Sequence, residues 1–158
     1  MKAPKQNASL EMAEDYADTL SALFYGLKDR CDTMPLTTVV GDVAWKICQF
    51  ENQREIVFIH FFHDGVTYRE EYCLWDGQLV EAIEGEERFY GTADRSEWSC
   101  WYHIKGNHIV NYASFGTGKT ETDSWEPSSI LEQWTLRKAE YNRLINLLAQ
   151  QRSPKSSQ

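Results

Sequence analysis

A histidine and several acidic side chains alternate with aromatic residues in the middle of the chain, a pattern that can support acid–base chemistry or ligand binding. His60 lies in the run REIVFIHFF (54–62), and Glu70 lies in VTYREEYCLW (66–75). If both runs are strands joined by a three-residue loop at 63–65, the register pairs Phe58 with Glu70 and places His60 and Glu70 on one face of the sheet. A carboxyl and an imidazole that share an apolar surface can exchange a proton, so this pair is the candidate catalytic pair.

The same face is a candidate ligand pocket. A two-residue turn at Asp76-Gly77 would bring the next strand beside it, with Leu74 paired to Leu79 and Tyr72 paired to Glu81. The expected ligand-binding residues are then Phe58, His60, Tyr68, Glu70, Tyr72 and Glu81. An apolar lining with a few convergent polar groups is typical of pockets for small molecules. We therefore expect an apolar or aromatic small molecule as ligand, with no cofactor. The alternative is an exposed sheet face with aromatic cross-strand pairs.

One segment comes close to a nucleotide-binding motif. Residues 113–120 (ASFGTGKT) match the phosphate-binding loop GxxxxGK[ST] except at the first position, where Ala113 stands. That loop works because it leads into a helix whose N-terminus holds the phosphates. Here the sequence continues ETDSWEP, which is a poor helix start. We expect a loop of Gly and Thr that could lie over the sheet, and no nucleotide hydrolysis.

Histidines and cysteines could bind a metal, but their spacing does not favour it. His103 and His108 lie on one expected hairpin, whose turn is Gly106-Asn107 and which pairs Ile104 with Ile109. No third or fourth ligand is marked beside the two histidines. The four cysteines are Cys31, Cys48, Cys73 and Cys100. They form no CxxC or CxxH pair, so the spacing of zinc and thioredoxin-like sites is missing. We expect no metal and four buried thiols, while a bond between two of the thiols stays open.

Hydrophobic periodicity predicts the elements that would position these side chains. Apolar residues three and four apart predict a first helix from Ser9 to Arg30, and a second helix opens at 127–129. Between them we expect strands at 43–50, 54–62, 66–75, 78–84 with an extension to 88–90, 98–105 and 108–115. The order predicts an α+β fold. In it an N-terminal helix precedes a curled antiparallel meander of six or seven strands, forming a cup or partly open barrel. The C-terminal helix packs on the sheet.

The length and composition of the chain limit the classes of protein to which it can belong. The chain has 158 residues, which suits one domain, expected at 9–150 with disordered tails at 1–8 and 151–158. Its 6 Trp, 8 Tyr and 7 Phe argue against a disordered chain. A formal net charge of −8 argues against binding the phosphate backbone of nucleic acids. We expect no membrane segment and no secretory signal, hence a cytoplasmic protein.

Acidic residues gather in one stretch and suggest an alternative function. The stretch from Glu81 to Glu97 contains Glu81, Glu84, Glu86, Glu87, Asp94 and Glu97 against Arg88 and Arg95. A surface of this kind could dock a basic protein and speed its association. The alternative is thus an acidic interaction module, such as an assembly chaperone, an adaptor or a toxin-neutralising protein. An edge strand such as 43–50 could also pair with a second copy of the chain.

Part of the meander is similar to a known family. The segment 47–91, and particularly EERFYGT (86–92), resembles the central strands of the T-type phycobiliprotein chromophore lyases. These are lipocalin-like antiparallel barrels that carry a linear tetrapyrrole to a protein cysteine. The resemblance covers under a third of the chain, which is shorter and ends in a helix that the family does not suggest. It implies a tetrapyrrole-like ligand or a role in handling a chromophore.

Overall fold

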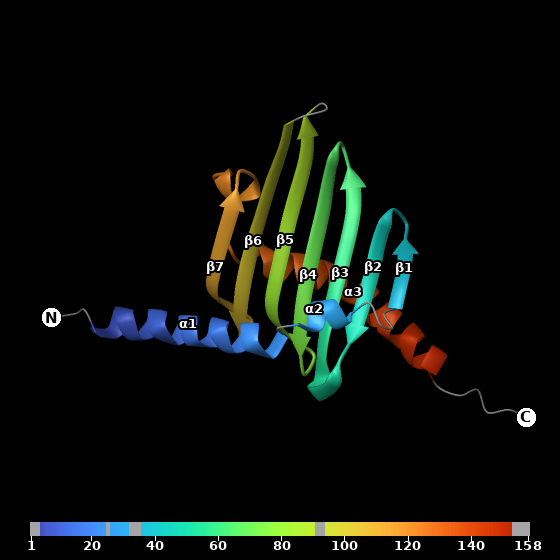
Figure 1. Ribbon diagram of the computed structural model, residues 1–158, viewed down its shortest axis with the longest axis horizontal. Coiled ribbons are helices and arrows are strands. Elements are labelled where there is room, and N and C mark those ends of the chain that lie inside the picture. Colours follow the sequence, from blue (N-terminus) through green and yellow to red (C-terminus); the bar gives the residue numbers. More distant parts are fainter. Residues whose placement is uncertain (1–3, 25, 32–35, 91–93, 153–158) are drawn as a thin grey trace, which may run out of the picture. The chain divides into compact units, whose positions relative to one another are not determined.

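The computed structural model describes residues 4–24, 26–31, 36–90 and 94–152 (Figure 1). The chain divides into two compact units, residues 1–127 and 128–158, each described here by itself. The described part contains helices α1 (Pro4–Phe24), α2 (Leu27–Arg30) and α3 (Ser129–Arg152), and short 3-10 turns at Glu51–Gln53 and Lys119–Glu121. Its strands are β1 (Leu36–Val40), β2 (Val43–Gln49), β3 (Arg54–His63), β4 (Val66–Trp75), β5 (Gln78–Tyr90), β6 (Asp94–Lys105) and β7 (His108–Gly116).

The strands form one antiparallel sheet in chain order. Each strand pairs with the next from β1 to β7, so β1 and β7 are the two edges of the described sheet. The sheet does not close into a barrel, because β1 and β7 are not neighbours. The predicted α+β class, with a helix, an open meander of seven strands and a final helix, is confirmed. All predicted strands are found, and β1 joins them as a strand that the pattern had not located.

The first helix differs from its prediction at both ends. α1 begins at Pro4, before Ser9, so residues 4–8 are helical. Proline suits the first turn of a helix, where its missing N–H costs nothing. Gly26 has a φ of 73°, a left-handed conformation that interrupts the helix and separates α1 from α2. Of the two predicted tails, residues 1–3 and 153–158 lie outside the described part of the chain.

The turn between β3 and β4 sets a register that differs from the predicted one. Asp64 and Gly65 both have positive φ, 49° and 77°, as a two-residue type I′ turn requires. His63 therefore pairs with Val66, and the loop has two residues instead of the predicted three. Because side chains alternate between faces, this shift of one residue turns the whole of β3 over relative to β4.

Two β-bulges produce the other register changes. Next to the Asp76-Gly77 turn, Leu74 pairs with Leu79 as predicted, but Cys73 pairs with Glu81, so Val80 is an extra residue. A second bulge leaves Val110 as the extra residue in β7. A bulge reverses the side-chain alternation on one strand of the pair.

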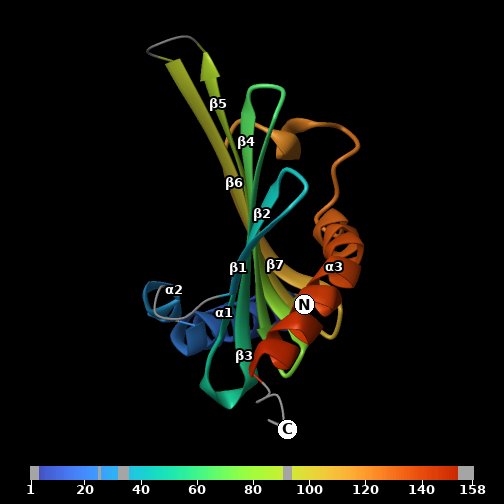
Figure 2. The same cartoon turned by 90° about the vertical axis from the view of Figure 1, so that its right-hand side faces the viewer.

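α1 and α2 lie on the same face of the sheet, near one end of the strands (Figures 1 and 2). Their apolar side chains form a core with the sheet, made of Leu20, Phe24, Leu27, Ile56, Cys73 and Val80. The Tyr16 hydroxyl donates to the Ile104 carbonyl oxygen at 2.6 Å, and the Arg54 guanidinium donates to the Leu23 carbonyl oxygen. The other end of this sheet face extends beyond the helices (Figure 2).

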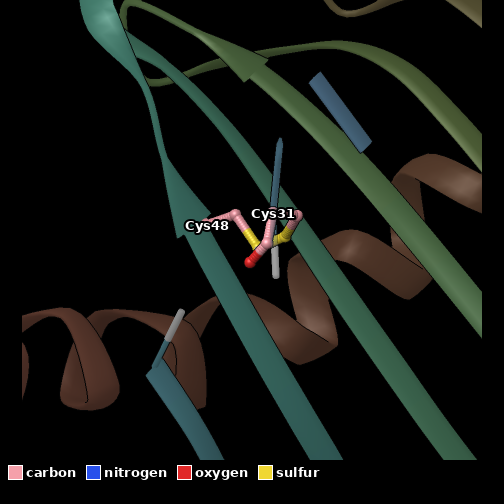
Figure 3. Close-up of a disulfide and its surroundings, with 2 residues drawn as sticks. All are labelled: Cys31 and Cys48. Carbon is pink, nitrogen blue, oxygen red and sulfur yellow. A yellow bond between two sulfur atoms is a disulfide. The ribbon is translucent and has the colours of Figure 1, made fainter. Parts of the chain in front are cut away.

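A disulfide joins Cys31, which follows α2, to Cys48 on β2 (Figure 3). The two Cα atoms are 5.5 Å apart, within the usual range for such a bond. Cys73 and Cys100 are free and buried. The expectation of four thiols was therefore wrong for this pair, because the fold brings together cysteines that are 17 positions apart in the sequence.

The second unit consists of α3, the helix predicted to open at 127–129. A buried apolar stripe repeats along it at helical spacing and contains Ile130, Trp134, Tyr141, Leu144 and Leu148. The Trp134 and Tyr141 rings are in contact, with their centroids 5.3 Å apart. The predicted packing of this helix on the sheet stays a prediction. Among the described helices, α3 included, none is long and apolar enough to cross a membrane.

Candidate functional site

One row of paired residues crosses the sheet on the face that also carries α1. His60, Arg69, Gly85, Ser99 and Phe115 occupy directly paired positions on β3 to β7. Ser99 has a short side chain, so the sheet surface is hollow there, and Gly85 has none, which leaves room for a neighbouring side chain to lie over it. This row lies beyond the core that α1 and α2 form with the same face.

The hollow is a pocket of about 460 Å³. We call it the sheet pocket. It is lined by the row from His60 to Phe115 together with Thr67, Glu86, Glu87, Glu97, Trp98 and Gly116. Its volume lies within the range of pockets that hold small molecules, which is roughly 300–1,000 Å³.

Arg69 lies along the floor of the sheet pocket. A Cβ atom built on Gly85 would be 2.6 Å from Arg69 Nε and 3.1 Å from Arg69 Cγ. The arginine therefore uses the space that any larger residue at position 85 would fill. Glycine inside a strand often marks such a close approach of another group. Within the described part of the chain, the Arg69 guanidinium makes no ion pair.

Aromatic side chains are exposed around the pocket. Phe115 is 55% exposed and makes an edge-to-face contact with Trp101 at 5.7 Å between ring centroids. Phe62 and Phe89 are also exposed, and their register places them on the same face. Large aromatic side chains left exposed together usually mark a surface that binds something.

The opposite face holds a buried polar cluster. Glu70 and Glu84 are paired neighbours on β4 and β5, and each is only 4% exposed. The Tyr72 hydroxyl donates to Glu70 at 2.6 Å, and the Tyr102 hydroxyl donates to Glu84 at 2.7 Å. Lys119 adds an ion pair to Glu84 at 3.0 Å. Each buried carboxylate thus has a hydroxyl donor, as burial of a polar group requires.

Burial and charge keep Tyr102 and Cys100 protonated. Desolvation, together with the neighbouring Glu84 carboxylate, raises the pKa of Tyr102 well above its usual value. Desolvation likewise raises the pKa of the Cys100 thiol. Tyr102 therefore stays a hydrogen-bond donor to Glu84, and the buried Cys100 thiol is a poor nucleophile.

The glycine-rich segment 113–120 takes part in this cluster and not in a phosphate site. Its first residues belong to β7, and Lys119 reaches back to Glu84. Thr120 accepts a hydrogen bond from the Trp98 indole at 3.0 Å. Gly118 lies against the Trp98 side chain, where a Cβ atom would not fit. The predicted loop over the sheet is therefore a strap, tied to the sheet by Lys119 and Thr120.

The structure separates the residues of the predicted pocket. Tyr68, Glu70 and Tyr72 share the face with the buried polar cluster, whereas Phe58, His60 and Glu81 lie on the opposite face. The predicted pairings of Phe58 with Glu70 and of Tyr72 with Glu81 are wrong. The physical reason is the two-residue turn between β3 and β4, together with the bulge at Val80. His60 and Glu70 therefore cannot exchange a proton directly across the sheet.

Each separated residue has a definite environment. His60 lines the sheet pocket, whereas Phe58 packs against the core near α1 with the Lys46 ammonium over its ring. Tyr68 stacks on Phe61 with ring centroids 4.8 Å apart. Tyr72 is completely buried. Of the six predicted ligand-binding residues, His60 is the one placed at the pocket.

Glu81 lies in a charged cluster under α2. Lys28 of α2 forms an ion pair with Glu71 at 2.6 Å. Burial raises the pKa of Glu81, although the Lys28 ammonium lowers it, and Glu71 adds repulsion. Burial alone would lower the pKa of Lys28, but the Glu71 carboxylate raises it overall. This cluster connects α2 to the sheet.

The acidic stretch is divided between the two faces. Along β5, Glu84 and Glu86 lie on the face of the buried cluster, and Glu81 and Glu87 lie on the pocket face. Glu84 pairs with Lys119, and Glu86 pairs with Arg88 at 3.2 Å. The side chains of Asp94 and Arg95, like residues 91–93, lie outside what the structure describes.

The structure marks no metal centre in its described part. No group of three or more His, Cys, Asp or Glu side chains there could hold an ion. His103 pairs with Asn111 in the register, and burial lowers the pKa of its imidazole. His108 is exposed beside the turn, opposite Lys105.

Sequence reasoning missed the residues that form the pocket floor. Arg69 and Ser99 belong to no motif, and the position of the row depends on the register of four strand pairs. The expected strand at 78–84 ended just before Gly85. A glycine between acidic residues inside a long strand was the one local signal of a close approach.

In comparisons with protein-family models, with curated proteins and with solved structures, no match to this chain is found.

Proposed function

We propose that the protein binds a small apolar or aromatic molecule in the sheet pocket. The observation that carries this proposal is the pocket of about 460 Å³ that Ser99 and the Arg69 side chain line on an exposed sheet face. Pockets of this size commonly bury most of a small ligand against apolar and aromatic walls. Phe115 and its partner Trp101 supply such a wall, and His60, Thr67 and Arg69 supply polar groups that could orient the ligand.

The alternative, an acidic surface for a basic protein, has less support. The alternation of β5 divides its glutamates between two faces, and two of them are already ion-paired. A linear tetrapyrrole, which the resemblance implies, is one aromatic ligand that could be tried. The proposal does not depend on a tetrapyrrole, since the pocket geometry requires only a small apolar body.

The proposal can be tested with a neutral fluorescent probe. N-phenyl-1-naphthylamine, an uncharged aromatic molecule, is titrated into the purified full chain, and its fluorescence gives the dissociation constant. Ser99→Phe fills the pocket floor. Ser114→Phe is the matched control, because Ser114 is exposed on the neighbouring strand and faces the other side of the sheet.

We expect one probe per chain and a loss of affinity of about 10-fold or more in Ser99→Phe, equivalent to about 1.4 kcal/mol. The Ser114→Phe variant should bind like the wild type. A second variant, Phe115→Ala, removes the aromatic wall and should also weaken binding. If the wild type binds no probe, or if both pocket variants bind it as tightly as the wild type while folded, the proposal is wrong. Native mass spectrometry of the purified chain would show any ligand that copurifies.

A further inference from the structure

We propose that the ligand of the sheet pocket carries a single negative charge, as a carboxylate or sulfonate does, and that Arg69 binds this group. This inference rests on the proposed function, because it names the class of molecule that the pocket takes. The proposed function specifies an apolar body for the ligand, and the inference adds a negatively charged group to that body.

The position of Arg69 is the first argument. Its side chain lies on Gly85 in the middle of the pocket floor, where the nearest atoms of a bound molecule would be. A guanidinium offers five N–H donors in a planar fork, and this fork matches the two oxygens of a carboxylate. Because the described residues provide the Arg69 guanidinium with no ion pair, its donors are available to a ligand.

Other donors surround Arg69 in the register. His60 is directly opposite on β3, and Ser99 lies across Gly85 on β6. Thr67 lines the same pocket, one position further along the face of β4. A ring N–H and two hydroxyl groups can each donate to an anion that the guanidinium holds. The pocket therefore offers further donors on both sides of Arg69.

The glutamates at the rim limit the ligand to one negative charge. Glu87 is a diagonal neighbour of Arg69, a relationship that places Cα atoms roughly 7–8 Å apart. Across water, the repulsion between two charges at such a distance is weak. A direct hydrogen bond between charged groups is stronger, so contact with Arg69 outweighs the repulsion for one charge. A second charge placed near Glu87 and Glu97 would meet this repulsion without contacting Arg69.

The aromatic wall fixes where the rest of the ligand lies. Phe115 occupies the position beside Ser99 at the β7 side of the pocket, and Trp101 contacts it edge-to-face. A planar apolar body that packs on Phe115 would direct its charged group towards the centre of the sheet, where Arg69 lies. The inferred ligand is an aromatic or apolar acid with one negative charge.

The test uses two probes that differ in one group. 8-Anilinonaphthalene-1-sulfonate has the aromatic body of N-phenyl-1-naphthylamine and one added sulfonate. Both are titrated into the wild type, Arg69→Gln and Arg69→Lys of the full chain. Arg143→Gln is the matched control, because Arg143 is an exposed arginine of α3 that pairs with Glu140. The quantity compared is the ratio of the two dissociation constants for each variant.

We expect the wild type to prefer the sulfonate by about 10-fold, a preference of about 1.4 kcal/mol. Arg69→Gln should abolish this preference, Arg69→Lys should keep part of it, and Arg143→Gln should keep all of it. If the neutral probe binds in the pocket and the preference is absent, or survives in Arg69→Gln, the inference is wrong while the proposed function stands. If neither probe binds in a manner that Ser99→Phe weakens, the proposed function itself fails.

Discussion

The Arg69 side chain of β4 lies across Gly85 of β5, 2.6 Å from the point where a Cβ atom of residue 85 would be. The second-nearest atom is also part of Arg69, and the Trp98 carbonyl oxygen follows at 3.3 Å. The arginine and the glycine therefore form one feature, in which the absence of a side chain on β5 fixes the path of a side chain from β4. This feature forms the floor of the sheet pocket.

Gly85→Ala should consequently displace Arg69 while leaving the fold intact. The flexible arginine can move, and glycine inside a strand costs stability, so the free energy of unfolding should change by less than about 1 kcal/mol. The preference for the sulfonate probe should fall several-fold, since the guanidinium no longer lies in place. In a double-mutant cycle, Gly85→Ala should add no further loss to Arg69→Gln. Independent, additive losses would show that Gly85 acts on the ligand by another route.

Lys119 should stabilise the strap that it ties to the sheet. Lys119→Met leaves the Glu84 carboxylate, 4% exposed, with its tyrosine donor but without this cation. Because a third of the lysine side chain is exposed, we expect a loss of about 1–3 kcal/mol, below the range for a fully buried pair. This loss in the free energy of unfolding is measured by urea unfolding, monitored by circular dichroism.

Two further variants complete this measurement. Adding Glu84→Gln removes the uncompensated charge and should recover part of the loss. Lys138→Met changes an exposed lysine of α3 and should leave the unfolding midpoint where it is. A Lys119→Met variant as stable as the control would mean that the ion pair contributes nothing.

Glu81 should make stability fall as the pH rises. Burial raises its pKa in the folded state above the usual value of 4.5, so ionisation costs more in the folded chain than in the unfolded one. The stability that protonated Glu81 gives the folded state is fully present below pH 4.5. It is lost as the pH rises through the raised pKa of the folded state. Glu81→Gln cannot ionise, so its stability relative to the wild type should be higher at pH 7 than at pH 4.

The measurement is urea unfolding of both proteins at the two pH values. Glu126→Gln, at an exposed glutamate remote in sequence from this cluster, is the matched control. A Glu81→Gln difference that is equal at both pH values would contradict the assigned effect of burial.

The disulfide should make the chain sensitive to reduction. Closing a loop between residues 17 apart stabilises a fold by about 3 kcal/mol in the chain-entropy view. Dithiothreitol should therefore lower the melting temperature of the wild type and leave that of a Cys31→Ala/Cys48→Ala variant unchanged. In unfolded but unreduced protein, alkylation should label Cys73 and Cys100 alone.

Labelling of all four cysteines in that unreduced sample would show that the bond does not form. The same measurement on protein trapped in cells bears on the predicted cytoplasmic location. Disulfides persist mainly in oxidising compartments, so a fully oxidised pair would argue against a reducing cytosol.

Much of the fold could be predicted from local sequence. Alternation of apolar residues located β2 to β7, because strands that bury one or both faces keep that pattern over their whole length. The turns at Asp76-Gly77 and Gly106-Asn107 were recognised because their residues tolerate positive φ, and the pairs Leu74–Leu79 and Ile104–Ile109 beside them were predicted correctly. Local chemistry is sufficient wherever the deciding contacts lie within a few residues.

The candidate site depended on tertiary structure. Val80 and Val110 are the extra residues of the two bulges, and nothing in their residue type marks them as such. Since side chains alternate with a period of two, each shift of one residue moved every later side chain to the other face. The two-residue turn after His63 separated His60 from Glu70, and the bulge at Val80 placed Arg69 opposite Gly85. By itself the sequence determined the elements and their order. Only the tertiary structure decided which side chains share a face, because register is a property of paired strands and not of either strand alone.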